Sequence, residues 1–278
     1  MSDSGIDIGV ADIFFDGYVR LYRQQLDKPF TPDNILNIES DMKSLSGIQA
    51  AVECAMRSEA EIAAVHPFAW NPEFGYVTAR PDFCGTGLEI SALFHLEGLH
   101  LIGDLDPTLN ALAGLRLDSS GCCGDGLRNA AHIIHVTNIH HLGADERSIA
   151  ERVGRVLQDL VHQETNARIR LVEELPRVFE DSIARSIAVL RSCRLLSEVE
   201  LLDIISPLCL AANLGFLDNF SRDEAREMMM ERIFLPMPSQ DAYQDQNEKD
   251  RRDAILADKM NRRFKGVRLN ARAKEWFS

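Results

Sequence analysis

Pro176 divides the chain into two parts with different sequence patterns. Before it, short apolar segments alternate with glycine clusters, which is typical of strands joined by turns. After it, apolar residues recur at helical spacing, and Ser197 and Ser221 each open a capping box, the pattern that begins a helix. We therefore expect an α+β fold in which a body of residues 1–176 precedes an all-helical domain of residues 177–278.

The first part has the signals of an antiparallel sheet flanked by helices. Runs of β-branched and aromatic residues predict strands at residues 74–78, 90–96 and 131–137. Good helix formers with apolar residues at helical spacing predict helices at residues 35–65 and 145–174. The second of these helices is long and ends where the helical domain begins.

Charge and cysteine content restrict the classes of function. The 278 residues carry a formal net charge of −13 at pH 7, so the surface would repel a polyanion and we expect no nucleic-acid binding. No apolar run reaches membrane-spanning length and no signal-peptide pattern opens the chain, which predicts a cytoplasmic protein without membrane attachment. The six cysteines lack the spacing of a disulfide framework and are expected to be free thiols.

Two segments carry a recognisable order of motifs. Residues 68–88, FAWNPEFGYVTARPDFCGTGL, place Trp-Asn-Pro, Phe-Gly-Tyr and Gly-Thr-Gly in one run, and a second glycine cluster at residues 120–126 precedes Thr-Asn and Leu-Gly. In this order and spacing the motifs resemble the guanidino kinase family, with the two glycine clusters in the place of its phosphate loops. The helical domain comes last, as in bacterial protein arginine kinases, whereas phosphagen kinases place a small helical domain first.

The resemblance implies phosphoryl transfer from Mg-ATP to a guanidinium nitrogen. Such a transfer depends on aligning the reactants and on cations that neutralise the phosphates. Arginine side chains suit phosphate oxygens because they bond bidentately and stay charged, and a carboxylate must orient the acceptor guanidinium and take its proton. Since relatives commonly dimerise, the resemblance also implies a homodimer.

Several family arginines are replaced in this chain. Residues 16–23 resemble the family's arginine-rich first strand, but the first arginine falls on Tyr18. The arginine after Gly-Thr-Gly falls on Glu89, and the one that opens the second phosphate loop falls on Ser120. The interval before Trp70 is far shorter than in the family and leaves no recognisable acceptor-binding loop.

The residues that remain at family positions define the predicted site. Arg20, Arg23 and Arg80 are the predicted nucleotide-binding residues, and Arg80 stands where the family has a reactive cysteine. Asp125 is the predicted catalytic residue, because protein arginine kinases carry a glutamate at this position. An aspartate between glycines also commonly bonds its own loop backbone, so a structural role is the alternative.

The helical domain has a predicted ligand site of its own. Residues 249–254, KDRRDA, resemble the phosphoarginine-binding motif Arg-Asp-x-x-Arg-Ala of protein arginine kinases, with lysine and Asp253 in place of the two arginines. Lys249, Asp250 and Arg252 are therefore the predicted phosphoarginine-binding residues. The alternative is a basic helix face that only contacts solvent.

A metal site is a further alternative. Thiolate and imidazole groups are the usual zinc ligands, and one stretch of the chain contains Cys122, Cys123, His132, His135, His140 and His141. Their spacing fits no zinc template, so we expect these side chains to lie in the core or on the surface and predict no metal.

The lost arginines favour a protein without efficient catalysis. Losing a charge-assisted hydrogen bond to a desolvated phosphate costs about 1.5–3 kcal/mol, and a carboxylate in that place adds repulsion. We therefore predict a catalytically impaired homologue that acts as a regulatory or binding protein without a cofactor. Phosphoarginine proteins or an active kinase homologue are its predicted partners. The alternative is an active protein arginine kinase that uses Mg-ATP through a rearranged site.

Overall fold

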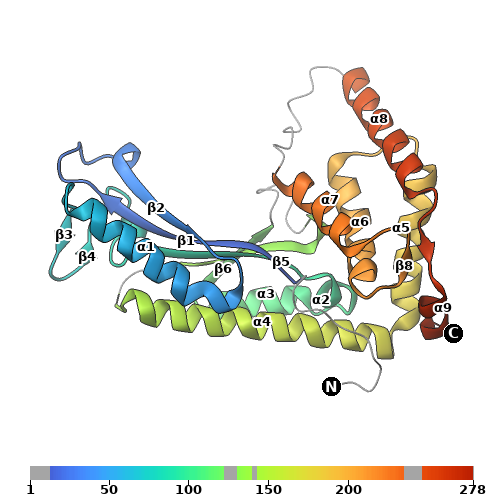
Figure 1. Ribbon diagram of the computed structural model, residues 1–278, viewed down its shortest axis with the longest axis horizontal. Coiled ribbons are helices and arrows are strands. Elements are labelled where there is room, and N and C mark those ends of the chain that lie inside the picture. Colours follow the sequence, from blue (N-terminus) through green and yellow to red (C-terminus); the bar gives the residue numbers. More distant parts are fainter. Residues whose placement is uncertain (1–12, 122–129, 140–142, 235–245, 278) are drawn as a thin grey trace.

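A computed structural model describes residues 13–121, 130–139, 143–234 and 246–277. A five-stranded antiparallel sheet with strand order β2-β1-β5-β7-β6 forms the centre of the body (Figure 1). Its strands are β1 (Phe14–Gln24), β2 (Ile35–Asp41), β5 (Leu88–His95), β6 (Leu117–Gly121) and β7 (Ile133–Asn138). A small hairpin of β3 (Trp70–Asn71) and β4 (Gly75–Tyr76) lies beside the C-terminal end of β1.

Helices cover one face of this sheet. They are α1 (Ile48–Ala63), α2 (Glu97–Leu101), α3 (Leu105–Gly114) and α4 (Glu146–Glu174). Alternate residues of the strands, among them Leu21 and Ile90, join Val52 of α1 and Leu157 of α4 in one buried core. The residues between them point to the other face, because successive side chains of a strand alternate.

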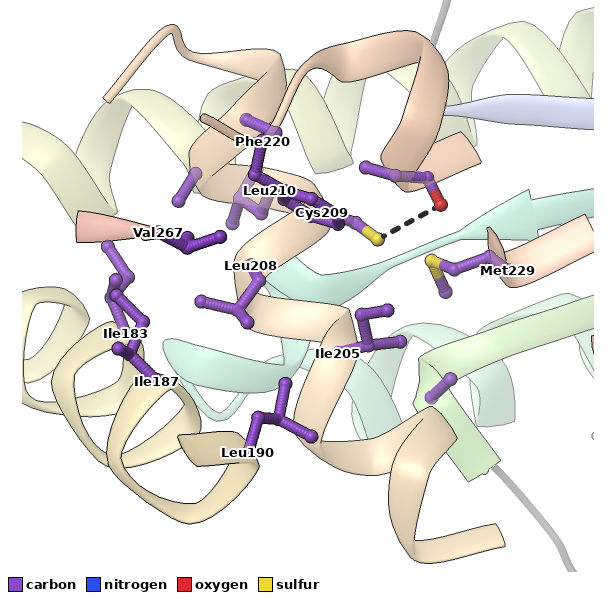
Figure 2. Close-up of a cluster of buried hydrophobic side chains, with 14 of the residues drawn as sticks. Ile183, Ile187, Leu190, Ile205, Leu208, Cys209, Leu210, Phe220, Met229 and Val267 are labelled. Atoms are coloured by element: carbon purple, nitrogen blue, oxygen red, sulfur yellow. Dashed lines mark hydrogen bonds between the residues drawn. The ribbon is translucent and has the colours of Figure 1, made fainter. Parts of the chain in front are cut away.

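The second unit is a helical domain at one end of the sheet (Figure 1). It consists of α5 (Pro176–Ser192), α6 (Glu198–Asn213), α7 (Arg222–Phe234), α8 (Gln246–Phe264), α9 (Ala271–Phe277) and a short ladder of β8 (Leu217–Asp218) and β9 (Arg268–Leu269). Figure 2 shows its core, where Leu190, Leu208 and Phe220 come together. Cys209 lies in this core, and its thiol is 3.5 Å from the carbonyl oxygen of Ala225.

The long helix α4 joins the two cores. Its 29 residues make it about 44 Å long, and its apolar stripe contributes Val153 to the core of the body and Leu171 to the core of the helical domain. Leu93 of β5 and Ile133 of β7 also belong to the core of the helical domain. The helical domain therefore covers one end of the sheet face that α1 and α4 leave free.

The structure confirms the α+β class and corrects two elements, one of which is the predicted strand at residues 74–78, where only Gly75–Tyr76 form a strand. The predicted strands at residues 90–96 and 131–137 correspond to β5 and β7, and the predicted long helix to α4. The predicted helix at residues 35–65 is wrong in its first part, where residues 35–41 form β2 and pair with seven residues of β1. Pairing with a neighbouring strand overrides local propensity here.

Candidate functional site

The sheet face that is not covered by α1 and α4 is polar, and we call it the polar face. Two rows of cross-strand partners run across it. The first row is Glu39, Arg20 and Glu89; the second is Asp41, Tyr18, Ser91, Thr137 and Asp118. Together these rows hold four carboxylates and one guanidinium. The predicted nucleotide-binding residue Arg20 thus lies on a face whose fixed charge is negative.

Arg20 is held by both of its neighbours in the first row. Its guanidinium pairs with Glu39, with Nε 2.9 Å from Oε2 and Nη2 closer still, and Nη1 lies 3.5 Å from Oε1 of Glu89. Nη1 also donates to the Tyr22 hydroxyl at 3.2 Å, and the group lies 4.4 Å from the centre of the Tyr18 ring. Partial burial disfavours the charge, but the bonds to Tyr22 and Glu39 outweigh it and raise the pKa of Arg20. The charge is therefore already neutralised by the protein.

Glu89 stands where the family resemblance places an arginine. Its carboxylate accepts a hydrogen bond from the Tyr22 hydroxyl at 3.2 Å in addition to facing Arg20. Burial raises the pKa of Tyr22, and the nearby Glu89 adds to the rise. A phosphate at this position would meet a negative charge instead of a guanidinium fork.

Arg23 is fully buried and belongs to the core of the body. Its Nε donates to Glu59 at 2.6 Å, its Nη1 donates to the carbonyl oxygen of Thr86 at 2.8 Å, and its guanidinium lies 3.6 Å from the centre of the Tyr76 ring. Burial and the hydrogen bond with Glu59 raise the pKa of Tyr76 to about 12. These contacts tie β1 to α1 and to the Gly-Thr-Gly turn, so Arg23 has a structural role in this conformation.

The Gly-Thr-Gly turn approaches β1 closely at Gly87. Gly87 has a φ of 53°, and a Cβ atom there would lie 2.6 Å from the carbonyl oxygen of Tyr22. Tyr22 in turn donates its backbone N–H to the Gly87 carbonyl oxygen at 2.9 Å. Only glycine fits this positive φ and this distance without a shift of the backbone.

Arg80 lies on the surface, on the loop that precedes this turn. Its Nη2 is 3.3 Å from Oδ2 of Asp82, and its guanidinium lies 4.4 Å from the centre of the Phe83 ring. Phe83 stacks on Tyr22 with ring centres 3.7 Å apart. Arg80 is the most exposed of the three predicted cations, with 52% of its side chain accessible, and it does not share carboxylate partners with Arg20 or Arg23.

Ser91 of the second row contacts His135, which the sequence analysis considered only as a candidate zinc ligand. The Ser91 hydroxyl forms a short hydrogen bond with Nε2 of His135, and Tyr18 also bonds to Ser91. Burial lowers the pKa of His135, although Glu89 and Asp118 oppose this, and burial raises the pKa of Tyr18. The alternation of side chains along strands would place Tyr18, Ser91 and His135 on one face of the sheet. That prediction also needs β7 to be paired with β5, which the sequence analysis did not attempt.

The remaining predicted residues of the body fall outside this cluster or outside the described chain. Asp125 lies outside the described residues, as do Cys122, Cys123, His140 and His141. Nδ1 of His132 lies 2.6 Å from Oε2 of the buried Glu97, whereas His135 contacts Ser91. Within the ranges that the structure describes, no group of three or more Cys, His, Asp or Glu side chains could hold a metal ion.

The predicted phosphoarginine-binding residues lie on α8. Arg252 pairs with Glu248 one turn earlier, at 2.7 Å, and Asp250 accepts a hydrogen bond from Gln246 at 2.8 Å. Asp250 and Arg251 line a shallow hollow of about 450 Å³ on this helix. Lys249 and Arg252 are not among the side chains that line it.

Comparison with known proteins decides the family. The sequence profile of the ATP:guanido phosphotransferase C-terminal catalytic domain matches residues 33–167, and that of the protein-arginine kinase McsB C-terminal domain matches residues 176–275. The chain belongs to the ATP:guanido phosphotransferase family. Its body has the guanidino kinase fold, and its helical domain is similar to that of the protein-arginine kinases.

The family members with similar sequences include several protein-arginine kinases. Those of Listeria welshimeri and of Exiguobacterium sp. are each 31% identical to this chain over 180 and 183 residues, and that of Clostridium acetobutylicum is 27% identical over 183 residues. The matches cover 65% to 66% of this chain and 53% to 54% of the relatives. The chain thus spans about half the length of the curated relatives that it matches.

Solved structures of guanidino kinases match more weakly. The duplicated taurocyamine kinase from Schistosoma mansoni with bound transition state analog components has a TM-score of 0.46 and 13% identity, over 69% of this chain and 40% of that one. Lombricine kinase has a TM-score of 0.33 and 20% identity, over 45% of this chain and 34% of that one. In the described part of this family member, no helix has the length and apolar composition needed to cross a bilayer.

Proposed function

We propose that this guanidino kinase homologue does not transfer phosphate from ATP at kinase rates and acts as a binding or regulatory protein. The observation that carries the proposal is the first row of the polar face. Arg20 lies between the carboxylates of Glu39 and Glu89, and Glu89 occupies a position where the family resemblance places an arginine. The protein's own carboxylates take the place of a bound polyphosphate.

The energetic argument concerns what a nucleotide would have to displace. To bind a phosphate, Arg20 must give up hydrogen bonds with Glu39, and the phosphate must approach Glu89 and Asp41 as well. Each charge-assisted bond that is lost costs about 1.5–3 kcal/mol, and like charges at close range add repulsion. The new contacts would have to offset both terms before any net affinity resulted.

The other two predicted cations do not supply a substitute clamp in this conformation. Arg23 is buried against Glu59, and moving it would leave an unpaired carboxylate in the core. Arg80 is accessible and is the feature that favours the alternative, an active protein arginine kinase that uses Mg-ATP through a rearranged site. A single exposed arginine contributes little to phosphate affinity compared with several arginine side chains that bind the same phosphate together.

The proposed partners follow from the helical domain. Its similarity to the C-terminal domain of protein-arginine kinases supports phosphoarginine proteins or an active kinase homologue as binding partners, and a homodimer as the assembly. In this function the protein needs no cofactor and works in the cytoplasm.

Two measurements on the purified chain test the proposal. Calorimetric titration with Mg-ATP is expected to give no saturable heat up to millimolar nucleotide. A transfer assay with an arginine-containing protein is expected to give no phosphoarginine above background. Micromolar nucleotide affinity together with transfer at ordinary kinase rates would overturn the proposal in favour of the active kinase, whose only cofactor would be Mg-ATP.

A further inference from the structure

A cationic hollow lies on the edge of the molecule, away from the polar face. It has a volume of about 420 Å³ and is bounded by the loop after β2, by α4 and by α7. Lys43 comes from the loop, His162 from α4 and Arg226 from α7. Since α4 covers the opposite face of the sheet from Arg20, this hollow is separate from the predicted nucleotide site.

The charge of the hollow is not compensated by its surroundings. None of its lining residues is acidic, and no carboxylate in the described ranges forms an ion pair with Lys43, His162 or Arg226. Arg20, Arg23 and Arg168, by contrast, each pair with a carboxylate. In a chain with a net charge of −13, a concave surface that holds a lysine and an arginine and no carboxylate focuses a positive potential and attracts anions.

Arg226 is fixed in place by neutral groups. Its Nη1 donates to the carbonyl oxygen of Phe14 at 3.4 Å, its Nη2 donates to that of Phe15, and the guanidinium lies 4.8 Å from the centre of the Phe15 ring. These contacts orient the guanidinium without neutralising its charge. An anion in the hollow would therefore meet a positioned cation and would bridge the helical domain to the body.

The remaining walls indicate the size and chemistry of the ligand. Phe14, Leu45 and Val161 provide apolar surface beside the cations. A second hollow of about 410 Å³, which Glu151 helps to line, adjoins the first along α4 and shares Leu45, Ser46 and Gln158 with it. The volume of the first hollow lies in the range of small-molecule sites. The hydroxyls of Ser44 and Ser46 and the amide of Gln158 could form hydrogen bonds with oxygen atoms of a ligand.

We propose that this hollow binds a small phosphate monoester, with the phosphate among Lys43, His162 and Arg226 and its apolar stem against Phe14 and Val161. A phosphate group suits the site because several donors from different elements converge on one space, and a dianion can accept from all of them. The site is independent of nucleotide binding on the polar face.

Titration with phenyl phosphate tests the site in the full-length chain. We expect saturable binding, tighter than that of inorganic phosphate, and weakening as the salt concentration rises. The double variant Lys43→Met/His162→Gln is expected to bind phenyl phosphate about tenfold more weakly. Lys28→Met, which removes one exposed lysine elsewhere, and Arg20→Gln on the polar face are expected to bind as the unmodified chain does.

Several results would overturn the assignment. They are the absence of saturable phenyl phosphate binding, equal affinity in the double variant, or loss of binding in Arg20→Gln. A phosphotyrosine peptide that bound more tightly than phenyl phosphate would replace the small molecule with a protein ligand. Should the double variant not fold, Lys43→Met alone gives the same comparison, because Lys43 is exposed. Mg-ATP titration of the same variants reports on the proposed function, and phenyl phosphate titration reports on the hollow, so the failure of one proposal can be told from the failure of the other.

Discussion

One charge on β5, that of Glu89, lies beside the guanidinium of Arg20 on the polar face. Glu89 is the cross-strand partner of Arg20. Its replacement by arginine removes a carboxylate that would repel phosphate and adds a second guanidinium beside that of Arg20. We expect Glu89→Arg to bind tripolyphosphate at least about tenfold more tightly, as measured by calorimetry. Glu61→Arg on the exposed surface of α1 makes the same change in net charge. An equal gain in both variants would mean that net charge alone sets the affinity.

Arg23 offers a second test at the scale of one residue. Arg23→Met leaves Glu59 without its partner in a buried setting, so we expect the free energy of unfolding to fall by about 3–5 kcal/mol. Adding Glu59→Leu should recover part of this loss, because the unpaired charge is then gone. Urea denaturation measures both. A loss below about 1 kcal/mol, together with reduced nucleotide binding, would mean that Arg23 is a ligand and not a structural residue.

Motif order predicted a replaced arginine at Glu89, but it could not predict which side chains surround this position. That the remaining Arg20 pairs with Glu39 depends on residues 35–41 forming a strand beside β1, and local propensity predicted a helix there. The burial of Arg23 was equally hidden, because its partner Glu59 lies 36 positions later, on α1. Long-range pairing of side chains depends on the register of the sheet, which a single sequence does not reveal.

At the scale of elements, α2 and α4 make a close contact through Gly98. The carboxylate of Glu164 accepts hydrogen bonds from the backbone N–H groups of Gly98 and Leu99, both at 2.9 Å, and pairs with Arg168. A Cβ atom at Gly98 would lie 2.9 Å from both Arg168 Cγ and Glu164 Oε1. The buried ion pair therefore requires a residue without a side chain on α2.

This contact reverses the usual effect of exchanging glycine for alanine in a helix. Alanine normally stabilises a helix by about 0.5–1 kcal/mol, and we expect this at Gly114 of α3, where a Cβ atom would meet nothing within 4 Å. At Gly98 we expect Gly98→Ala to lower the free energy of unfolding by about 1–3 kcal/mol because of overpacking. Thermal unfolding of the two variants compares them directly. Stabilisation in both would refute the close contact.

The elements themselves were largely predictable where local signals were strong. The long helix, its N-cap Asp145 and the strands that became β5 and β7 follow from apolar periodicity and capping. The predicted strand at residues 74–78 reduces to the two residues of β4, because its partners are the equally short β3 and a single bridge from Tyr76 to Gly85. The length of a strand depends on the segments that pair with it, and a prediction from local sequence alone does not identify those segments.

At the scale of the whole molecule, a buried polar cluster joins the sheet to the helical domain. Ser206 of α6 places its hydroxyl 2.8 Å from Nε2 of His95 on β5 and 2.8 Å from the carbonyl oxygen of Ala131. The same hydroxyl contacts Glu97, whose carboxylate also holds His132. Because these groups come from both parts of the chain, their protonation affects how the two parts pack together.

His95 makes the stability of the whole chain depend on pH. Burial, with smaller contributions from Arg168 and His132, lowers the pKa of His95 well below its ordinary value of 6.5. Below pH 6.5 the unfolded chain binds a proton that the folded chain does not, so the free energy of unfolding falls as pH falls. The expected slope from this group is about 1.4 kcal/mol per pH unit, down to the folded-state pKa. Above pH 6.5, neither state binds the proton and the contribution to the slope vanishes.

The variant His95→Gln isolates this contribution, because glutamine can still donate to Ser206 but does not titrate. Denaturant unfolding at a series of pH values should show a shallower decline for the variant than for the unmodified chain below pH 6.5. Burial also lowers the pKa of His100 and of His135, so a smaller decline of the same sign should persist in the variant. Parallel curves for the two proteins would show that His95 is protonated in the folded chain, and that the junction of the two domains accommodates a charge.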